Sequence, residues 1–142
     1  MFRQILTTLR DRVTTRFGVT HWVLHLRPGM PLLPGQAVLR VFDCREETMG
    51  SERVLVRTAS CGLAVAVPVP SGQAVEAQVT ALETAIALSD TVQHVLACSP
   101  TYRIPDSRVL ALDVVQRPGQ ENAWFCQAFI AFEITVAAEA GP

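Results

Sequence analysis

The segment RVLVRTASCGLAVAVPV, residues Arg53–Val69, is the strongest strand signal in the sequence. It is rich in β-branched and small apolar residues, and prolines at 68 and 70 end it, so it predicts one long strand. A β-bulge is expected around Cys61–Gly62, in the middle of this strand. Ala37–Cys44 has a similar pattern, and the two runs together predict a long antiparallel hairpin.

The segment between these two runs is densely charged. We predict that residues 43–53 form a charged hairpin connector. Before the first run, residues 28–36 contain prolines at 28, 31 and 34 and predict an irregular arm, because proline lacks the backbone donor that a strand needs. Val19–Leu26 is β-branched and aromatic enough to predict a short strand ahead of that arm.

Two helices are expected. The first begins near the N-terminus and ends at Gly18, because apolar residues recur there every three or four positions. The second begins near Ser71, runs to about Leu88 and restarts at Ser89–Asp90. An apolar stripe, the feature by which a helix packs on a sheet, lies along the second helix. Its members are Val75, Val79, Leu82 and Ile86.

The last two strands are predicted at Arg108–Gln116 and Trp124–Ala137, the latter alternating between apolar and polar residues. Residues 138–142 are expected to form a loose tail. The order of elements predicts an α+β fold, in which the N-terminal and central helices pack over one face of a mainly antiparallel sheet. At 142 residues, the chain fits a single domain, residues 1–142.

Composition bounds the function. The formal net charge of −1 disfavours bulk binding of nucleic acid, and no run of eighteen apolar residues predicts a membrane span. Every basic residue is an arginine, whose planar group suits bidentate pairing with carboxylates. The cysteines are widely spaced, so we expect reduced core residues in a cytoplasmic protein. They are Cys44, Cys61, Cys98 and Cys126.

The sequence also lacks the patterns of catalysis and of cofactor binding. His21 and His25 lie about 13 Å apart in a strand, too far to bind one metal ion, and His94 is isolated. Neither a phosphate-binding glycine loop nor a G-x-S-x-G motif is present. The adjacent carboxylates Glu46 and Glu47 are expected to point apart on an exposed hairpin. The sequence therefore predicts a protein that is not an enzyme and that uses no cofactor or metal.

The chain resembles the tail terminator family of long-tailed bacteriophages, the lambda minor tail protein U type. The resemblance covers nearly the whole chain: an amphipathic helix, a strand at LPGQAVLRV, a charged connector at DCREETMGSE and a strand that ends in prolines. A long helix, a helix restart at ALSDTVQHVL and a closing hairpin follow. The order and spacing of these elements carry the resemblance. The proline-rich arm and the final AAEAGP depart from it.

This resemblance implies a structural virion protein. It implies a homohexameric ring on the finished tail tube, which stops growth of the tube and presents the surface for the head–tail connector or stopper protein. The implied partners are other copies of the chain, the tail tube protein and that connector, with genomic DNA only as passing cargo and no membrane. The implied location is the tail or neck of the virion, assembled in the cytoplasm of the bacterial host.

Ring closure requires unlike surface patches that meet on neighbouring copies. We hypothesise that a projecting charged hairpin contacts a neighbouring subunit or the tube and sets the register by complementary charge. A solvated loop that protects strand edges is the alternative. The hypothesised residues are Arg45, Glu46, Glu47, Met49, Glu52 and Arg53. A second interface is hypothesised on the first helix, at Arg3, Arg10, Arg12 and Arg16, with a solvated face as its alternative.

The sequence is compatible with two alternative functions. One is another neck or tail-completion protein. The other is a small cytoplasmic α+β module that binds a ligand in a pocket under the sheet. In that case Trp22, Tyr102 and Trp124 supply aromatic walls, although such residues more often belong to a core.

Overall fold

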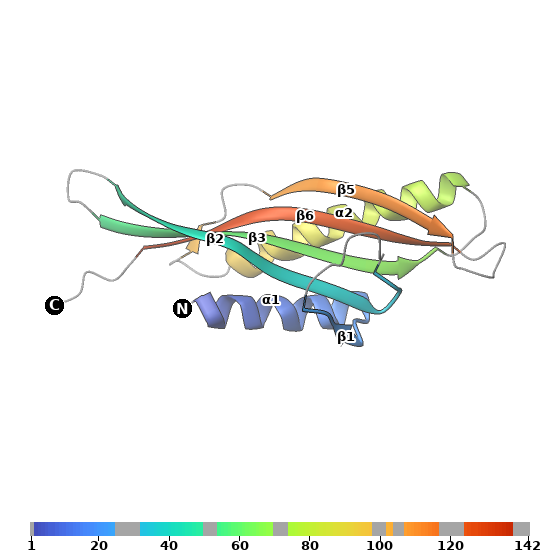
Figure 1. Ribbon diagram of the computed structural model, residues 1–142, viewed down its shortest axis with the longest axis horizontal. Helices are drawn as coiled ribbons and strands as arrows, with labels where there is room; N and C mark the ends of the chain where they lie inside the picture. Colours follow the sequence, from blue (N-terminus) through green and yellow to red (C-terminus); the bar gives the residue numbers. More distant parts are fainter. Residues whose placement is uncertain are drawn as a thin grey trace.

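Four long antiparallel strands form the centre of the structure, a computed structural model (Figure 1). The strands are β2 (Gln36–Met49), β3 (Val54–Pro68), β5 (Ser107–Gln116) and β6 (Trp124–Ala137). Their order in space is β2, β3, β6, β5. The structure describes residues 2–24, 32–49, 54–69, 74–97, 102–103, 107–116 and 124–137.

Two short strands extend this sheet. The strand β1 (His21–Trp22) pairs with β2 in parallel, and β4 (Tyr102–Arg103) pairs with β6 antiparallel. The sheet is therefore mixed but mostly antiparallel, and the fold is α+β as the sequence predicts. The short strand expected over Val19–Leu26 is only two residues long, because β1 meets β2 only at the first residues of β2.

A tight turn sets this pairing. Gly35 has a φ of 87°, a left-handed conformation that favours glycine. Its carbonyl accepts hydrogen bonds from the backbone of Thr20 at 2.8 Å and of His21 at 3.2 Å, which places β1 beside the start of β2. Of the arm predicted over residues 28–36, residues 28–31 lie outside the described part of the structure.

The helix α1 (Phe2–Phe17) ends where the sequence predicts. Gly18 has a φ of 63°, and the Val19 backbone N–H donates to the carbonyl of Thr14 at 3.2 Å. This bond spans five residues and completes a Schellman motif, in which a left-handed glycine follows the last helical turn. Ile5, Leu9 and Val13 are buried on one side of α1, as an amphipathic helix requires.

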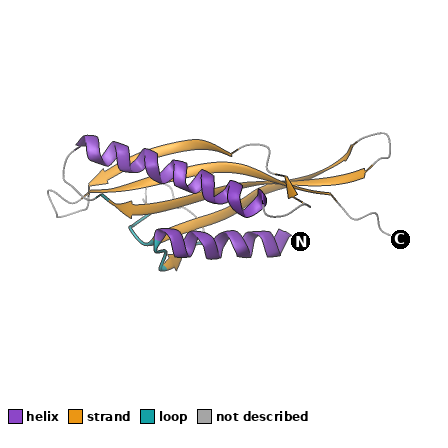
Figure 2. Cartoon of the chain, turned by 180° about the vertical axis from the view of Figure 1, so that it is seen from behind, coloured by secondary structure: helices purple, strands orange, loops and turns teal. Residues whose placement is uncertain are grey.

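The helix α2 (Ala74–Ala97) is continuous, so the predicted restart at Ser89–Asp90 is wrong. Residues that favour helix starts are tolerated inside a helix when their side chains point outward or bond to the preceding turn. Asp90 is exposed, and Thr91 Oγ1 donates to the carbonyl of Ala87 at 2.7 Å. Both helices cover the same face of the sheet (Figure 2).

The larger hydrophobic core lies between the helices and this face. β6 contributes alternate residues to it, which confirms the alternation read from its sequence. These residues are Ala128, Ile130, Phe132, Ile134 and Val136. A smaller cluster lies on the opposite face, where Leu32 packs over Ala64 and Phe125. The backbone N–H of Leu32 donates to Gln127 Oε1 at 2.7 Å and fixes the chain over this face.

The side of α2 that packs on the sheet differs from the prediction. The predicted stripe of large apolar residues is exposed, at 42% for Val79 up to 69% for Val75. The sheet instead contacts a side of mainly small residues. Small side chains let a helix approach its neighbour closely, because the packing distance depends on the side chains at the contact. The buried residues are Ala77, Ala81, Thr84, Ala85, Leu88, Thr91 and Val92.

The bulge expected at Cys61–Gly62 lies in the facing strand instead. The register of β2 against β3 shifts between Val41 and Asp43, and Phe42 is the extra residue. A Cβ atom added to Gly62 would lie 2.8 Å from the Phe42 ring and 2.7 Å from the Phe129 ring. The glycine therefore leaves space for two aromatic rings that cross the strand at this point.

Candidate functional site

The charged segment after Phe42 is strand rather than connector. β2 continues to Met49, and its partners on β3 run from Ser60 opposite Asp43 to Val54 opposite Met49. The prediction of a connector over residues 43–53 is therefore wrong for 43–49, because the charges pair across the hairpin and let both strands continue. Residues 50–53, which include the hypothesised Glu52 and Arg53, lie outside the described residues.

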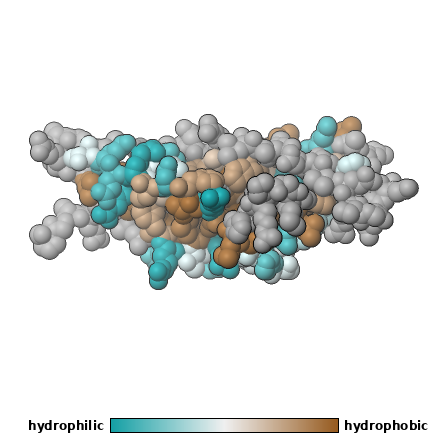
Figure 3. All heavy atoms as spheres, viewed as in Figure 1, coloured by the Kyte–Doolittle hydropathy of each residue, from teal (hydrophilic) through white to brown (hydrophobic). Residues whose placement is uncertain are grey.

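The hairpin extends past both helices at one end of the molecule (Figure 1). β6 ends at Ala137, opposite Val56, so the last two rungs of the hairpin have no third strand beside them among the described residues. The exposed run of β2 begins at Arg40 and continues through Thr48. Hydrophilic residues gather over this end, while apolar residues cover the middle of the same face (Figure 3).

Arg45, on the sheet face away from the helices, has two acidic partners. Its Nη2 donates to both carboxylate oxygens of Glu133 in β6, at 3.2 Å each. Its Nε lies 3.4 Å from Glu47 Oε1, so one guanidinium contacts two carboxylates. The hydrogen bond and charge of Glu133 raise the pKa of Arg45. Arg45 therefore ties β2 to β6 across the strand between them.

Glu46 has its partner on the other side of the hairpin. Arg57 Nε donates to Glu46 Oε1 at 2.8 Å, and the two residues are directly opposite in the β2–β3 register. Strand neighbours alternate between faces, so Arg45 and Glu47 lie on one face and Glu46 on the other. Arg45, Glu46 and Glu47, the hypothesised residues whose side chains are described, thus do not form one patch. Met49 is described only as the end of β2.

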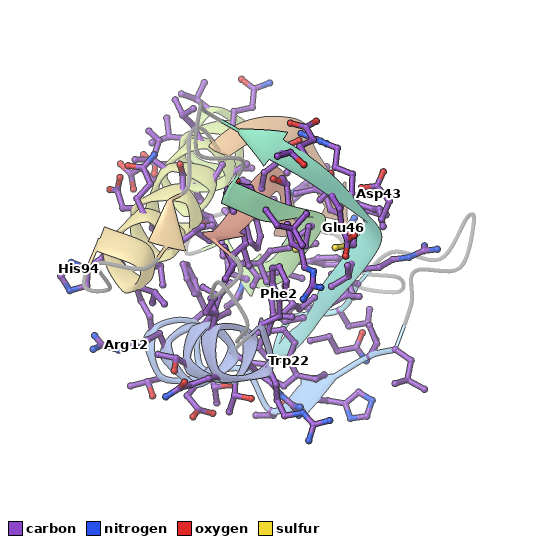
Figure 4. The ribbon with its side chains drawn as sticks, turned by 90° about the vertical axis from the view of Figure 1, so that its left-hand side faces the viewer. Phe2, Arg12, Trp22, Asp43, Glu46 and His94 are labelled. Carbon is purple, nitrogen blue, oxygen red and sulfur yellow. The ribbon has the colours of Figure 1, made fainter. Side chains whose placement is uncertain are left out.

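The arginines of α1 fall on two edges of the helix. Arg12 and Arg16 lie on the edge toward α2, where they line a pocket of about 210 Å³ with His94. Arg16 Nη1 donates to Thr91 Oγ1 at 2.9 Å, which fixes its guanidinium against α2. Figure 4 shows Arg12 and His94 on the same side of the molecule. The pocket is small and positively charged, which suits an anionic group.

Arg3 and Arg10 lie on the opposite edge. They line a groove of about 460 Å³ between α1 and β1, together with Leu6, Trp22 and Leu24. The Cζ atom of Arg10 lies 5.4 Å from the centroid of the Trp22 ring, so its guanidinium stacks on that ring. Trp22 Nε1 donates to Thr14 Oγ1 at 3.0 Å. The predicted arginine face is therefore two separate surfaces with different neighbours.

The aromatic pocket of the ligand-binding alternative is not assembled as expected. Trp22 lines the groove beside α1, while Trp124 lies at the start of β6 and is not among the residues that line that groove. The side chain of Tyr102 is outside the described part of the structure. The groove that does exist is rimmed by arginine and open to solvent on the outside of the fold.

The cysteines divide between core and surface. Cys61 and Cys126 are buried, as predicted, and burial raises the pKa of Cys61 to about 12 and raises the pKa of Cys126. Cys44 is exposed, so the prediction of a core residue is wrong there. Cys44 belongs to the exposed run of β2 between Arg40 and Thr48. Cys98 lies outside the described residues.

The histidines that the sequence analysis considered as metal ligands do not form one metal site among the described residues. His21 and His94 are exposed on β1 and α2, and His25 is outside the described residues. No group of three metal-binding side chains occurs within the part of the chain that is described. No helix in that part is long and apolar enough to cross a membrane.

Two residues of the charged hairpin network were not identified from the sequence. Glu133 and Arg57 supply the partners of Arg45 and Glu46. Each is the one charged residue of its strand, β3 or β6, which is a signal for a ladder pair on a solvated face. The sequence gives no register between β2 and β6, so this signal does not name the partner.

No family model matches the sequence, and no curated protein matches it either.

Proposed function

We propose that this protein is a tail terminator of a long-tailed bacteriophage. It forms a homohexameric ring on the last ring of the tail tube, ends growth of the tube, and presents a surface to the head–tail connector or stopper protein. DNA passes through the ring. The protein acts by shape and contacts in the virion tail or neck, without catalysis or a cofactor.

The observation that carries the proposal is the long β2–β3 hairpin. It reaches beyond the helices and narrows to two strands among the described residues (Figure 1). In a ring, each copy contacts two neighbours through unlike surfaces, and an element that extends past the body of the subunit reaches the next copy. Charged groups of both signs on this hairpin favour one register of contact over others.

The order of elements also supports the proposal. An N-terminal amphipathic helix, a long pair of strands, a long helix and a closing pair of strands follow one another as in the resemblance noted from the sequence. Two parts of that resemblance differ, because α2 has no restart and residues 43–49 are strand. The ion pairs of Arg45 and Glu46 are about half exposed, so they brace the hairpin and leave oxygen and nitrogen atoms open to a neighbour. The ion pairs within the hairpin therefore leave room for the hypothesised contact between the hairpin and a neighbouring subunit.

A small ligand-binding module is the second candidate, favoured by the groove beside Trp22. Its polar groups are mainly the two arginines, Arg3 and Arg10, so a ligand there is anionic with an apolar part. A terminator and such a module differ in assembly. The module is a monomer or dimer of constant mass, whereas the terminator forms rings or binds the ends of tubes.

Light scattering over a concentration series measures the mass of the protein, first alone and then mixed with a candidate tail tube protein, and so tests the proposal. A species near 93 kDa, about six times the chain mass of 15.5 kDa, supports a closed ring. Tubes that become shorter or capped in electron micrographs support assembly on the tube. A mass that stays at one or two chains at every concentration, with tubes of unchanged length, contradicts the terminator and favours the binding module. Another neck protein is indicated if rings form but tube length is unchanged.

A further inference from the structure

The outer side of α2 carries a stripe of large apolar residues that no other described element packs against. The outer α2 stripe consists of Val75, Val79, Leu82 and Ile86, which are 69%, 42%, 49% and 50% exposed. The spacings of four, three and four residues place them in one line along the helix. The opposite side of the same helix is buried on the sheet. A helix that is apolar on both sides is typical of one buried between two layers.

Carboxylates follow one edge of this stripe. Glu76, Glu83 and Asp90 are exposed and seven residues apart, which places them in a row two helical turns from one to the next. No arginine forms an ion pair with them within the described residues. The outer side of α2 is therefore an apolar ridge with an acidic border.

The groove between α1 and β1 has the complementary character. Leu6, Trp22, Val23 and Leu24 line it, and Leu24 is 90% exposed. Its border is basic, because Arg3 and Arg10 lie seven residues apart along α1, the same interval as the acids of α2. Neither arginine pairs with a carboxylate in the described part of the structure. An apolar groove of about 460 Å³ with a basic border thus accompanies the acidic ridge on one chain.

We propose that the outer α2 stripe of one copy binds in the α1–β1 groove of a second copy of this chain, with Glu76 and Glu83 paired to Arg3 and Arg10. The two surfaces lie on different elements, so the contact is head-to-tail, and a pair of copies keeps one free ridge and one free groove. Such a contact repeats from copy to copy and forms a ring when the rotation between copies closes. The inference deepens the proposed ring and rests on the proposed function for the number of copies.

Charge and shape favour a second copy over an unrelated partner. A partner for the ridge needs an apolar hollow with positive groups at a matching interval, and the chain itself supplies both. Self-pairing of two ridges is disfavoured, because it brings the carboxylate rows of two copies together without a basic residue from either stripe. The ridge-to-groove contact instead pairs Glu76 and Glu83 with the two arginines that border the groove.

Charge exchange tests this contact directly. The variant E76R/E83R places like charges opposite Arg3 and Arg10, and R3E/R10E does the same from the other side. We expect each variant alone to lower the association constant at least tenfold by light scattering, since like charges facing each other oppose binding. Mixing the two variants restores association, because each then offers the complement of the other. The fourfold variant, which carries both exchanges, also restores it.

Controls separate this contact from general effects of charge and folding. The variant T8E adds a negative charge at an exposed position of the same helix that lines neither the groove nor the pocket beside α2, and we expect it to associate as the parent chain does. Circular dichroism and thermal unfolding establish that each variant is folded. If an exchanged variant does not fold, V79S/I86S tests the apolar ridge alone and is expected to weaken association.

The outcomes for the contact and for the function are distinct. Association that is unchanged by either exchange, or that the mixture does not restore, overturns the contact and leaves the ring to other surfaces. Restored association of the mixture together with tubes of unchanged length supports the contact but contradicts the terminator. A parent chain that stays monomeric at every concentration and on tubes overturns both.

Discussion

The guanidinium of Arg45 in β2 and the carboxylate of Glu133 in β6 meet across the strand between them, with Arg45 Nη2 3.2 Å from each carboxylate oxygen. The two residues are 88 positions apart in the sequence. On the same face, Thr58 in the intervening strand β3 and Thr135 in β6 form a side-chain hydrogen bond of 3.1 Å. This polar row fastens three strands together just before the hairpin narrows.

The ion pair of Arg45 and Glu133 is expected to contribute little to stability, because both side chains are partly exposed and salt screens them. A double-mutant cycle of Arg45→Ala and Glu133→Ala in urea unfolding measures the coupling. We expect a small favourable coupling at low salt that disappears near ~1 M salt. A coupling that persists at high salt contradicts this view of an exposed pair. If Arg45 also contacts a neighbour, its replacement weakens association more than that of Glu133.

The packing of α2 on the sheet predicts very different losses of stability when two leucines of this helix are replaced. Leu88 is fully buried, so Leu88→Ala is expected to lower the free energy of unfolding by about 2–5 kcal/mol. Leu82 is 49% exposed, so Leu82→Ala changes that free energy of the monomer by less than about 0.5 kcal/mol. Urea unfolding at a concentration where the chain is monomeric measures both. Equal losses at the two positions would falsify the assignment of the buried side.

Gly62 is expected to tolerate no side chain without a shift of its neighbours. A Cβ there lies 2.7 Å from Phe129 and 2.8 Å from Phe42, so Gly62→Ala is expected to cost about 1–3 kcal/mol of stability. Phe42 is 49% exposed and its ring is removed in Phe42→Ala. The double variant is therefore expected to lose less stability than the sum of the two single variants. Additive losses in thermal unfolding argue that the rings do not compete for this space.

The cysteines are expected to react at very different rates. In a Cys98→Ser chain at pH 8, a thiol reagent modifies the exposed Cys44 first, and Cys44→Ser removes this fast reaction. Burial raises the pKa of Cys61 to about 12, so its thiol stays protonated and unreactive in the folded chain. Reaction of more than one thiol per folded chain at this pH contradicts the burial of Cys61 and Cys126.

The same raised pKa sets the sign of a pH effect. The folded chain holds the Cys61 proton more tightly than the unfolded chain, in which the thiol ionises near its ordinary pKa of about 8.5. The contribution to stability is therefore complete below that value and is lost as the pH rises toward about 12. In urea unfolding, Cys61→Ala is expected to weaken the alkaline fall in stability. An unchanged slope argues that other groups cause it.

Local patterns in the sequence were enough for most of the elements. The end of α1 follows from Gly18, whose left-handed conformation completes the helix cap. The buried face of β6 follows from alternation, because a strand places successive side chains on opposite faces. The full length of β2 was not predicted, because a run of charged residues at 45 to 47 is typical of a turn. In the folded chain, Arg57 and Glu133 pair with these charges and the strand continues.

Most of the helices and strands and the α+β class follow from the amino-acid sequence, because turn residues and apolar periodicity act over a few neighbouring positions. Which side of α2 meets the sheet depends on the packing of the folded chain. Both sides of that helix are apolar, and the choice depends on how closely small residues such as Ala81 and Ala85 let it approach β5 and β6. The large residues Val75 and Ile86 are left outside by that choice, because the close packing of the small side has no room for them.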